Sequence, residues 1–80
     1  MQETKIYNSK EFVDASIALT IKEVVEALEE KGYNPINQIV GYLMSGDPGY
    51  ISSYKECRNR ITKFQREEIL ELMLNNFIGK

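Results

Sequence analysis

The sequence contains no histidine and no tryptophan, and Cys57 is its single cysteine. One cysteine cannot close an intrachain disulfide, and without histidine the chain cannot supply the usual ligands of a zinc site. Histidine is also the commonest general base in enzymes, and there is no phosphate-cradling glycine loop or nucleophile–base pair. We therefore expect a non-enzyme without a metal or cofactor. Cys57 lies among basic residues that could lower its thiol pKa, or it is a partly buried structural residue.

A strong excess of one charge is also missing, because 10 Lys and Arg residues stand against 12 Asp and Glu, for a net charge of −2. Dedicated nucleic-acid-binding domains are usually basic, so this balance argues weakly against one. No apolar run approaches the roughly 18 to 20 residues that span a bilayer. Residues 1–5 lack the layout of a secretory signal. We expect a cytoplasmic protein without membrane insertion.

The chain is short, since 80 residues is near the lower limit for a domain held by a hydrophobic core alone. Chains of this size usually gain a disulfide, a metal or a second copy, and the composition leaves only the second copy. With 42% hydrophobic and 28% charged residues, the chain is typical of a globular protein. The pattern predicts a flexible N-terminal arm over residues 1–13 and a single helical domain over 14–80.

Apolar residues at helical spacing predict an all-α fold, a compact bundle of about four to five helices. The first helix is expected over 15–31, with Asp14 or Ser16 as its cap and Gly32 at its end. Asn34 and Pro35 predict a second helix over 35–45. Its inward face is expected to hold Ile36, Ile39, Val40, Leu43 and Met44. Gly41, in its interior, indicates either close approach of another helix or simple tolerance.

The second half of the chain is expected to contain shorter helices. Asp47 followed by Pro48 predicts a helical turn over 48–51, and Ser52 or Ser53 can start a segment over 54–61. Thr62 and Gln65 have the spacing of a capping box, which predicts a break near Thr62 and a final helix over 63–78. One continuous helix over 54–78 is the alternative.

The final helix is apolar on more of its circumference than an ordinary surface helix. An 80-residue monomer has few elements to surround it, so we expect a homodimer in which this helix contributes to the interface. The alternative is a central helix wrapped by its own chain. The expected interface residues are Ile69, Leu70, Met73, Leu74 and Phe77.

Residues 55–66 contain five basic side chains and one acid, in a chain that is acidic elsewhere. One interpretation is a docking site for an acidic protein surface or a phosphate. The other is a solvated face with intrachain pairs to Glu67, Glu68 or the acidic first helix. A small DNA-binding regulator is a further alternative, although helix 35–45 contains no Lys or Arg. The basic residues are Lys55, Arg58, Arg60, Lys63 and Arg66, of which Lys55, Arg58 and Arg66 would share a face on a continuous helix.

The run KGYNPINQIVGYLMSGDPGYI at residues 31–51 closely resembles the signature of the IreB/ReoM family of small Gram-positive bacterial regulators. Downstream, Arg58, Ile61, Arg66, Glu68 and Ile69 fit the same pattern. The resemblance implies a small, helical, homodimeric and non-enzymatic protein that is a substrate of a membrane Ser/Thr kinase with extracellular PASTA domains. It also implies regulation of peptidoglycan synthesis. In the best-known branch this occurs through ClpCP-dependent degradation of MurA, so MurA or a Clp protease component is an expected partner.

By the same resemblance, Thr4 corresponds to the family's phosphoacceptor, because it precedes an apolar and aromatic pair, Ile6 and Tyr7, in the arm. Arg58 and Arg66 match basic positions that carry regulatory function in the family. Ser53 and Thr62 stand where relatives often have arginine, so the basic patch is thinner in this chain.

Overall fold

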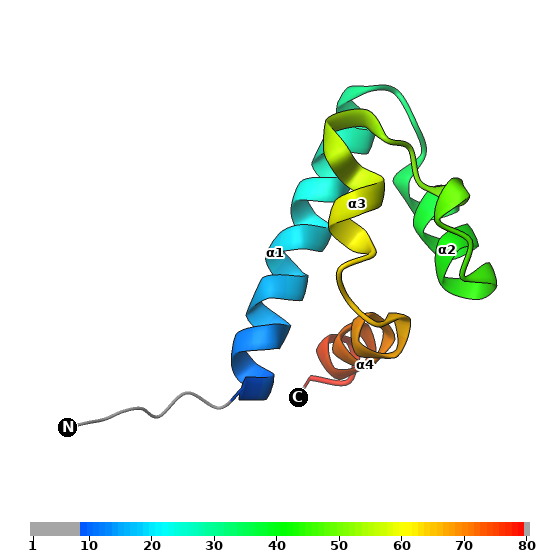
Figure 1. Ribbon diagram of the computed structural model, residues 1–80. Coiled ribbons are helices and arrows are strands. Elements are labelled where there is room, and N and C mark those ends of the chain that lie inside the picture. Colours follow the sequence, from blue (N-terminus) through cyan, green and yellow to red (C-terminus); the bar gives the residue numbers. More distant parts are fainter. Residues whose placement is uncertain (1–8, 80) are drawn as a thin grey trace.

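The computed structural model describes residues 9–79, which form four α-helices and two 3₁₀ helices (Figure 1). No strand occurs in that range, so the predicted all-α bundle of four to five helices is confirmed. None of the helices in residues 9–79 is both long enough and apolar enough to cross a membrane. The elements are α1 (Ser9–Glu30), α2 (Pro35–Ser45), η1 (Pro48–Tyr50), η2 (Tyr54–Glu56), α3 (Cys57–Ile61) and α4 (Arg66–Phe77).

Helix α1 begins at Ser9, six residues before the predicted start, so residues 9–13 are helical. Asp14 and Ser16 lie inside the helix, and neither is its cap. The apolar stripe extends backward because Val13 packs on the core one turn before Ile17. At the other end Gly32 has a φ of +89°, and the next amide donates to the Leu28 carbonyl at 2.9 Å, as predicted for a left-handed cap.

Helix α2 has the predicted bounds. The Asn34 side chain accepts a hydrogen bond from the Asn37 amide at 3.1 Å, and Pro35 occupies the first turn. At its end, Gly46 adopts a φ of +78° and its amide donates to the Tyr42 carbonyl at 2.7 Å. Asn34 and Pro35, as predicted, fix the start of the helix, and Gly46 fixes its end.

The inward face of α2 differs from the prediction. Ile39 and Tyr42 are buried, whereas Ile36, Val40 and Met44 are 70%, 50% and 80% exposed. The helix is rotated so that the aromatic ring of Tyr42 enters the core, and the aliphatic edge of the expected stripe faces outward. Gly41 leaves room for the side chain of Tyr50 and not for another helix, because a Cβ at position 41 would lie 2.5 Å from Cδ1 of Tyr50.

Between α2 and α4 the chain makes short turns with local caps. The Asp47 carboxylate accepts from the Gly49 amide at 2.8 Å, and the Ser52 hydroxyl accepts from the Tyr54 amide at 3.1 Å. The expected segment over 54–61 is split, because Lys55 and Glu56 have φ values of 49° and 62°. η2 therefore ends in a kink before α3 begins.

The predicted break near Thr62 is confirmed, and the continuous helix over 54–78 is wrong. The capping box lies three residues later than expected: Gln65, not Thr62, is the N-cap of α4, and the Glu68 carboxylate accepts from the Gln65 amide at 3.0 Å. The Thr62 hydroxyl donates to the Arg58 carbonyl at 2.9 Å, so Thr62 ends α3 and does not start α4.

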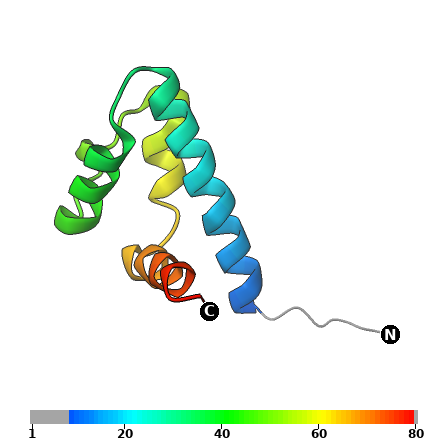
Figure 2. The same cartoon turned by 180° about the vertical axis from the view of Figure 1, so that it is seen from behind.

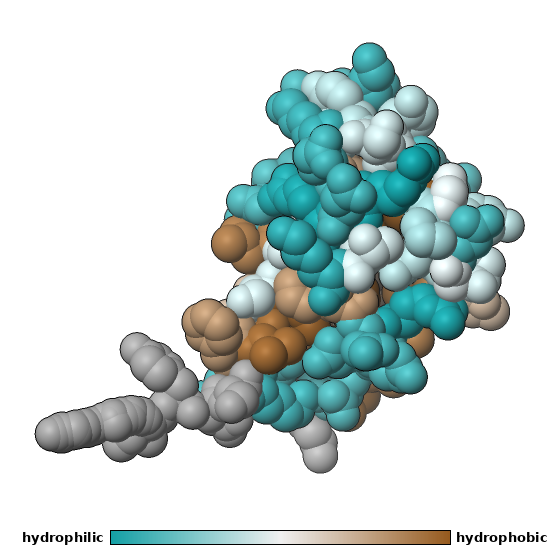
Figure 3. Space-filling view, viewed as in Figure 1, coloured by the Kyte–Doolittle hydropathy of each residue, from teal (hydrophilic) through white to brown (hydrophobic). Residues whose placement is uncertain are grey.

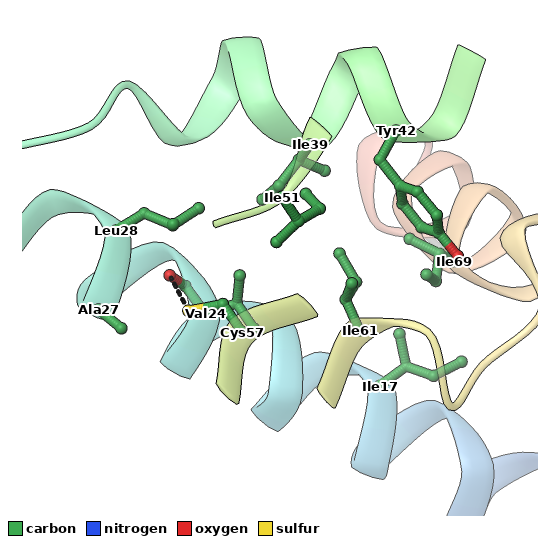
Figure 4. Packing of buried hydrophobic residues seen from close by; sticks show 10 residues of the cluster. All are labelled: Ile17, Val24, Ala27, Leu28, Ile39, Tyr42, Ile51, Cys57, Ile61 and Ile69. Atoms are coloured by element: carbon green, nitrogen blue, oxygen red, sulfur yellow. Dashed lines mark hydrogen bonds between the residues drawn. The ribbon is translucent and has the colours of Figure 1, made fainter. Parts of the chain in front are cut away.

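The core lies along one side of α1, where every other α-helix contacts it (Figures 1 and 2). α3 runs beside α1 in both views, and α4 crosses near its N-terminal half. Figure 4 shows how side chains from all of these elements meet. The buried residues are Ile17, Val24, Ala27, Leu28, Ile39, Tyr42, Ile51, Cys57, Ile61 and Ile69.

Candidate functional site

Helix α4 carries a second apolar stripe that points away from the core. Leu70, Met73, Leu74 and Phe77 have the spacing i, i+3, i+4, i+7 and are 43%, 37%, 61% and 88% exposed. Ile69, the fifth residue predicted at the interface, is fully buried in the core of its own chain. The helix is therefore apolar on more sides than one copy covers, and it is not wrapped by its own chain.

An open apolar groove lies between α1, α2 and α4, with a volume of about 440 Å³. Ile36 and Val40 of α2 line it, and Met73 of the α4 stripe stands on its opposite wall. A smaller hollow of about 220 Å³ between α1 and α4 shares Ile21 and Met73 with the groove. The sequence pattern missed this groove because it assigned Ile36 and Val40 to the core.

A second exposed apolar area lies on the outer side of α1. Figure 3 shows hydrophobic side chains gathered over the N-terminal half of this helix, while the surface over its C-terminal half and α3 is hydrophilic. Phe12 and Leu19, which are two turns apart, are 66% and 58% exposed. This area and the groove are separate, since neither residue lines the groove.

The basic segment 55–66 begins with a close contact to the end of α1. The Lys55 ammonium lies 2.7 Å from Oε1 of Glu30, and the Tyr54 hydroxyl donates to Oε2 of the same carboxylate at 3.1 Å. These bonds hold the pKa of the Glu30 carboxyl below its usual value and raise the pKa of Lys55. Lys31 and Lys55 both lie over the Tyr54 ring.

One turn further on, Arg60 pairs with Glu23 of α1. Lys55 and Arg60 therefore follow the interpretation in which the basic residues pair with the acidic first helix. Glu67 and Glu68, the other expected partners, have no ion pair with the segment among residues 9–79.

Arg58 and Arg66 bind backbone carbonyls. Nε of Arg58 donates to the Ile51 carbonyl at 3.0 Å, and Nη1 of Arg66 donates to the Leu43 carbonyl at 3.0 Å. The Arg66 guanidinium also covers Gly46, where an added Cβ would lie 2.9 Å from Cζ. Both arginines thus hold the connection between α2 and α3 in place. Each has further N–H groups that these bonds do not use.

Lys63 is different, because it is exposed and its side chain has no hydrogen bond or ion pair within residues 9–79. The break at Thr62 also separates the five cations onto different elements. Lys55, Arg58 and Arg66 therefore do not share the single helical face that a continuous helix would give them. The structure brings Arg58 and Arg66 to the connection between α2 and α3, and it pairs Lys55 of η2 and Arg60 of α3 with acids of α1.

An ion pair that the sequence did not indicate joins the first turn of α1 to α4. The Lys10 ammonium lies 3.0 Å from Oε1 of Glu71 in α4 and 3.6 Å from Asp14. The two partners are 61 positions apart in the chain, so no local pattern could reveal the pair.

Cys57 is fully buried, with Sγ 3.9 Å from the Val24 carbonyl oxygen. Burial raises the pKa of its thiol, and this outweighs the lowering effect of Arg60 and Lys55. The interpretation of Cys57 as a thiol with a lowered pKa is therefore wrong, and the alternative of a structural cysteine agrees with the fold.

The DNA-binding alternative gains no support from the arrangement of the helices. α2, the helix in the place of a recognition helix, has no basic residue, and two of the five cations of the basic segment are paired with acids of α1. Thr4, the expected phosphoacceptor, lies outside residues 9–79.

The comparison with protein families agrees with the resemblance of the central signature. The sequence model of the family described as IreB regulatory phosphoprotein matches residues 2–79. This match covers nearly the whole chain and includes Thr4, the exposed stripe of α4 and the basic segment. The chain therefore belongs to the IreB family of regulatory phosphoproteins.

Proposed function

We propose that this protein is a cytoplasmic, homodimeric regulator of peptidoglycan precursor synthesis in a Gram-positive bacterium. A membrane PASTA Ser/Thr kinase phosphorylates it at Thr4, and it controls the ClpCP-dependent degradation of MurA by binding MurA or a Clp protease component. It acts without catalysis of its own. The observation that carries this proposal is the family match over residues 2–79, because the family is one of regulatory phosphoproteins and the match includes Thr4.

The exposed stripe of α4 supports the homodimer. Leu74 and Phe77 are more than half exposed, although an isolated soluble domain rarely leaves such a contiguous stripe uncovered. A second copy covers it by mass action once its concentration exceeds the dissociation constant. Sedimentation equilibrium should give twice the chain mass of 9.3 kDa.

The basic segment supports docking of an acidic group. Lys63 is uncommitted within residues 9–79, and Arg58 and Arg66 keep N–H groups free for a carboxylate or phosphate. A phosphate on Thr4 adds about −1.5 to −2 charge, which can compete with an acidic partner for these cations. Phosphorylation would then change partner binding without any change in the helical fold.

The direct test of the modification is incubation with the host's PASTA kinase, followed by mass mapping of the phosphosite. We expect one phosphate on Thr4 and none on the Thr4→Ala variant. If the kinase leaves residues 1–8 unmodified, the phosphorylation part of the proposal is wrong.

The regulatory step can be followed in a reaction that contains ClpCP, MurA and this protein. We expect Thr4→Glu and Thr4→Ala to differ in the rate at which MurA is degraded. Equal rates for the two variants would overturn the switch, whatever the kinase does.

The docking step is tested by charge reversal. Lys63→Glu should weaken binding to the acidic partner, and Lys31→Glu is the matched control, since Lys31 is exposed, lies outside segment 55–66 and lines neither the groove nor the hollow. An equal effect of both variants would indicate general electrostatics instead of a docking site.

A further inference from the structure

Helix α2, like α4, has an apolar face that is exposed to solvent. None of its 11 residues is charged, yet Ile36, Val40 and Met44 are 70%, 50% and 80% exposed. Surface helices normally place charged residues on the solvent side. The outer face of α2 is therefore suited to contact with another apolar surface.

This surface is continuous with the exposed stripe of α4. The groove of about 440 Å³ has Ile36 and Val40 on one wall and Met73 on the other. Its floor is formed by Ile21 and Val25 of α1, and the hollow next to it extends the apolar floor back to Ile17. A partner that covers the α4 stripe at Met73 thus meets the α2 wall as well.

We propose that the groove between α1, α2 and α4 receives the exposed α4 stripe of a second copy, so that α2 forms half of each contact in the dimer. This inference rests on the homodimer proposed above and adds which surfaces meet. In a two-fold dimer the α2–α4 contact occurs twice, once in each direction, so both exposed faces of both chains are covered.

The dimensions match this occupant. From Ile17 to Glu29, the floor of the groove and hollow spans about 18 Å of helix α1. α4 has 12 residues, a length of about 18 Å. Its stripe has the i, i+3, i+4, i+7 spacing with which a helix is anchored in an apolar groove. The stripe itself holds no charged residue, and the groove carries only Glu29, with Lys22 beside the hollow.

The first experiment places a charge on each of the two surfaces. Val40→Glu in α2 and Leu74→Glu in α4 should each raise the dimer dissociation constant by about 100-fold or more, because the carboxylate would be buried without a partner. Leu19→Glu is the matched control, since Leu19 is similarly exposed but lies on the outer face of α1. Circular dichroism at low concentration checks that each monomer keeps its helices.

The second experiment tests the pairing itself. Val40→Lys and Leu74→Glu should each be monomeric alone, and an equimolar mixture should form a heterodimer. In that heterodimer one α2–α4 contact holds the lysine–glutamate pair and the other is unaltered. If α4 instead met only α4, and α2 only α2, the mixture would place neither new charge opposite the other and would stay monomeric.

The outcomes separate the two proposals. A monomeric wild-type protein would overturn the homodimer, and this inference with it. A dimeric Val40→Glu variant beside a monomeric Leu74→Glu variant would leave the homodimer standing and overturn the role of α2. Loss of the dimer in Leu19→Glu, with Val40→Glu unaffected, would place the contact on the outer face of α1 instead.

Discussion

Two tyrosine rings determine how α2 is held against the rest of the chain. Tyr42 is 5% exposed and occupies the core next to Ile39. Tyr50, from the turn after the helix, lies against the helix backbone at Gly41. The side chain of a residue other than glycine would meet that ring, so a glycine inside a helix is favoured here by packing, against its poor helix propensity.

Gly41→Ala should therefore destabilise the protein, although alanine is the better helix former by roughly 1 kcal/mol. The new Cβ would lie 2.5 Å from the Tyr50 ring, so the ring must move, and we expect a net loss of about 1–2 kcal/mol in the free energy of unfolding. Urea denaturation measures it. In a Tyr50→Ala background the same substitution should stabilise, and a loss there too would show that the ring is not the cause.

The Glu30 carboxylate should give the protein part of its resistance to acid. Its pKa is lowered by hydrogen bonds from Lys55 and Tyr54, so its contribution to stability is present above the unfolded value near 4.5 and is lost as the pH falls through the folded value. The Glu30→Gln variant should lose less stability than the wild type between neutral and acid pH.

Urea denaturation at several pH values checks this, with Glu26→Gln in the same helix as the control. Glu26 has no ion pair among residues 9–79. If the wild type and Glu30→Gln lose the same free energy of unfolding between neutral and acid pH, the contact with Lys55 does not persist in solution.

At the scale of the elements, the kink between η2 and α3 is the least regular part of the chain. Lys55 and Glu56 both adopt left-handed backbone angles, which cost roughly 1–2 kcal/mol for a residue with a Cβ. The contacts of Lys55 with Glu30, and of Glu56 Oε1 with Asn59 at 2.6 Å, hold the kink. It directs α3 along α1, which places Cys57 and Ile61 in the core.

This backbone conformation predicts that glycine is more stable than alanine at position 56, the reverse of the order in a regular helix. At position 56, Glu56→Gly should be about 1 kcal/mol more stable than Glu56→Ala, since both lose the contact with Asn59 and only alanine is strained. In the regular helix α1 the order should reverse, with Glu26→Ala more stable than Glu26→Gly by a similar amount. Thermal denaturation of the four variants measures both differences, and the same order at both positions would contradict the kink.

The ends of the elements could be predicted from sequence far better than their orientation. Asn34 and Asp47 accept hydrogen bonds from amides within three residues, and Pro35 and Pro48 act through their fixed φ, so local spacing reveals these helix starts. The rotation of α2 could not be predicted, because Tyr42 and the aliphatic edge around Val40 compete for the same core. Only the packing of the whole chain decides between them.

The candidate site also has features that the sequence predicts and features that it does not. The excess of apolar residues on α4 could be read from the sequence, since it depends on one helix alone. The use of Arg58 and Arg66 on the Ile51 and Leu43 carbonyls could not, because a guanidinium has the same sequence signal whether it binds a partner or its own backbone. Phosphorylation at Thr4 and the partners stay predictions.

At the scale of the whole molecule, the proposed homodimer predicts that stability depends on association. A second copy that binds only the folded chain raises the thermal midpoint with concentration. We expect the midpoint of the wild type to rise by a few degrees for a tenfold increase in concentration. Leu74→Glu should have a lower midpoint that does not depend on concentration, and Leu19→Glu should behave like the wild type. A concentration-independent wild type would argue against the dimer.

The length of helix α1 limits which cations a phosphate on Thr4 could reach. A polypeptide extends by at most about 3.5 Å per residue, so a phosphate on Thr4 is tethered within about 20 Å of Ser9. Glu30, and Lys55 with it, lies about 31 Å along the axis from that point, whereas Glu71 is bonded to Lys10 beside it. The tether length therefore ranks the cations: within one chain, a phosphate on Thr4 would fall short of Lys55, at the far end of α1, and could reach only cations that lie nearer to Ser9.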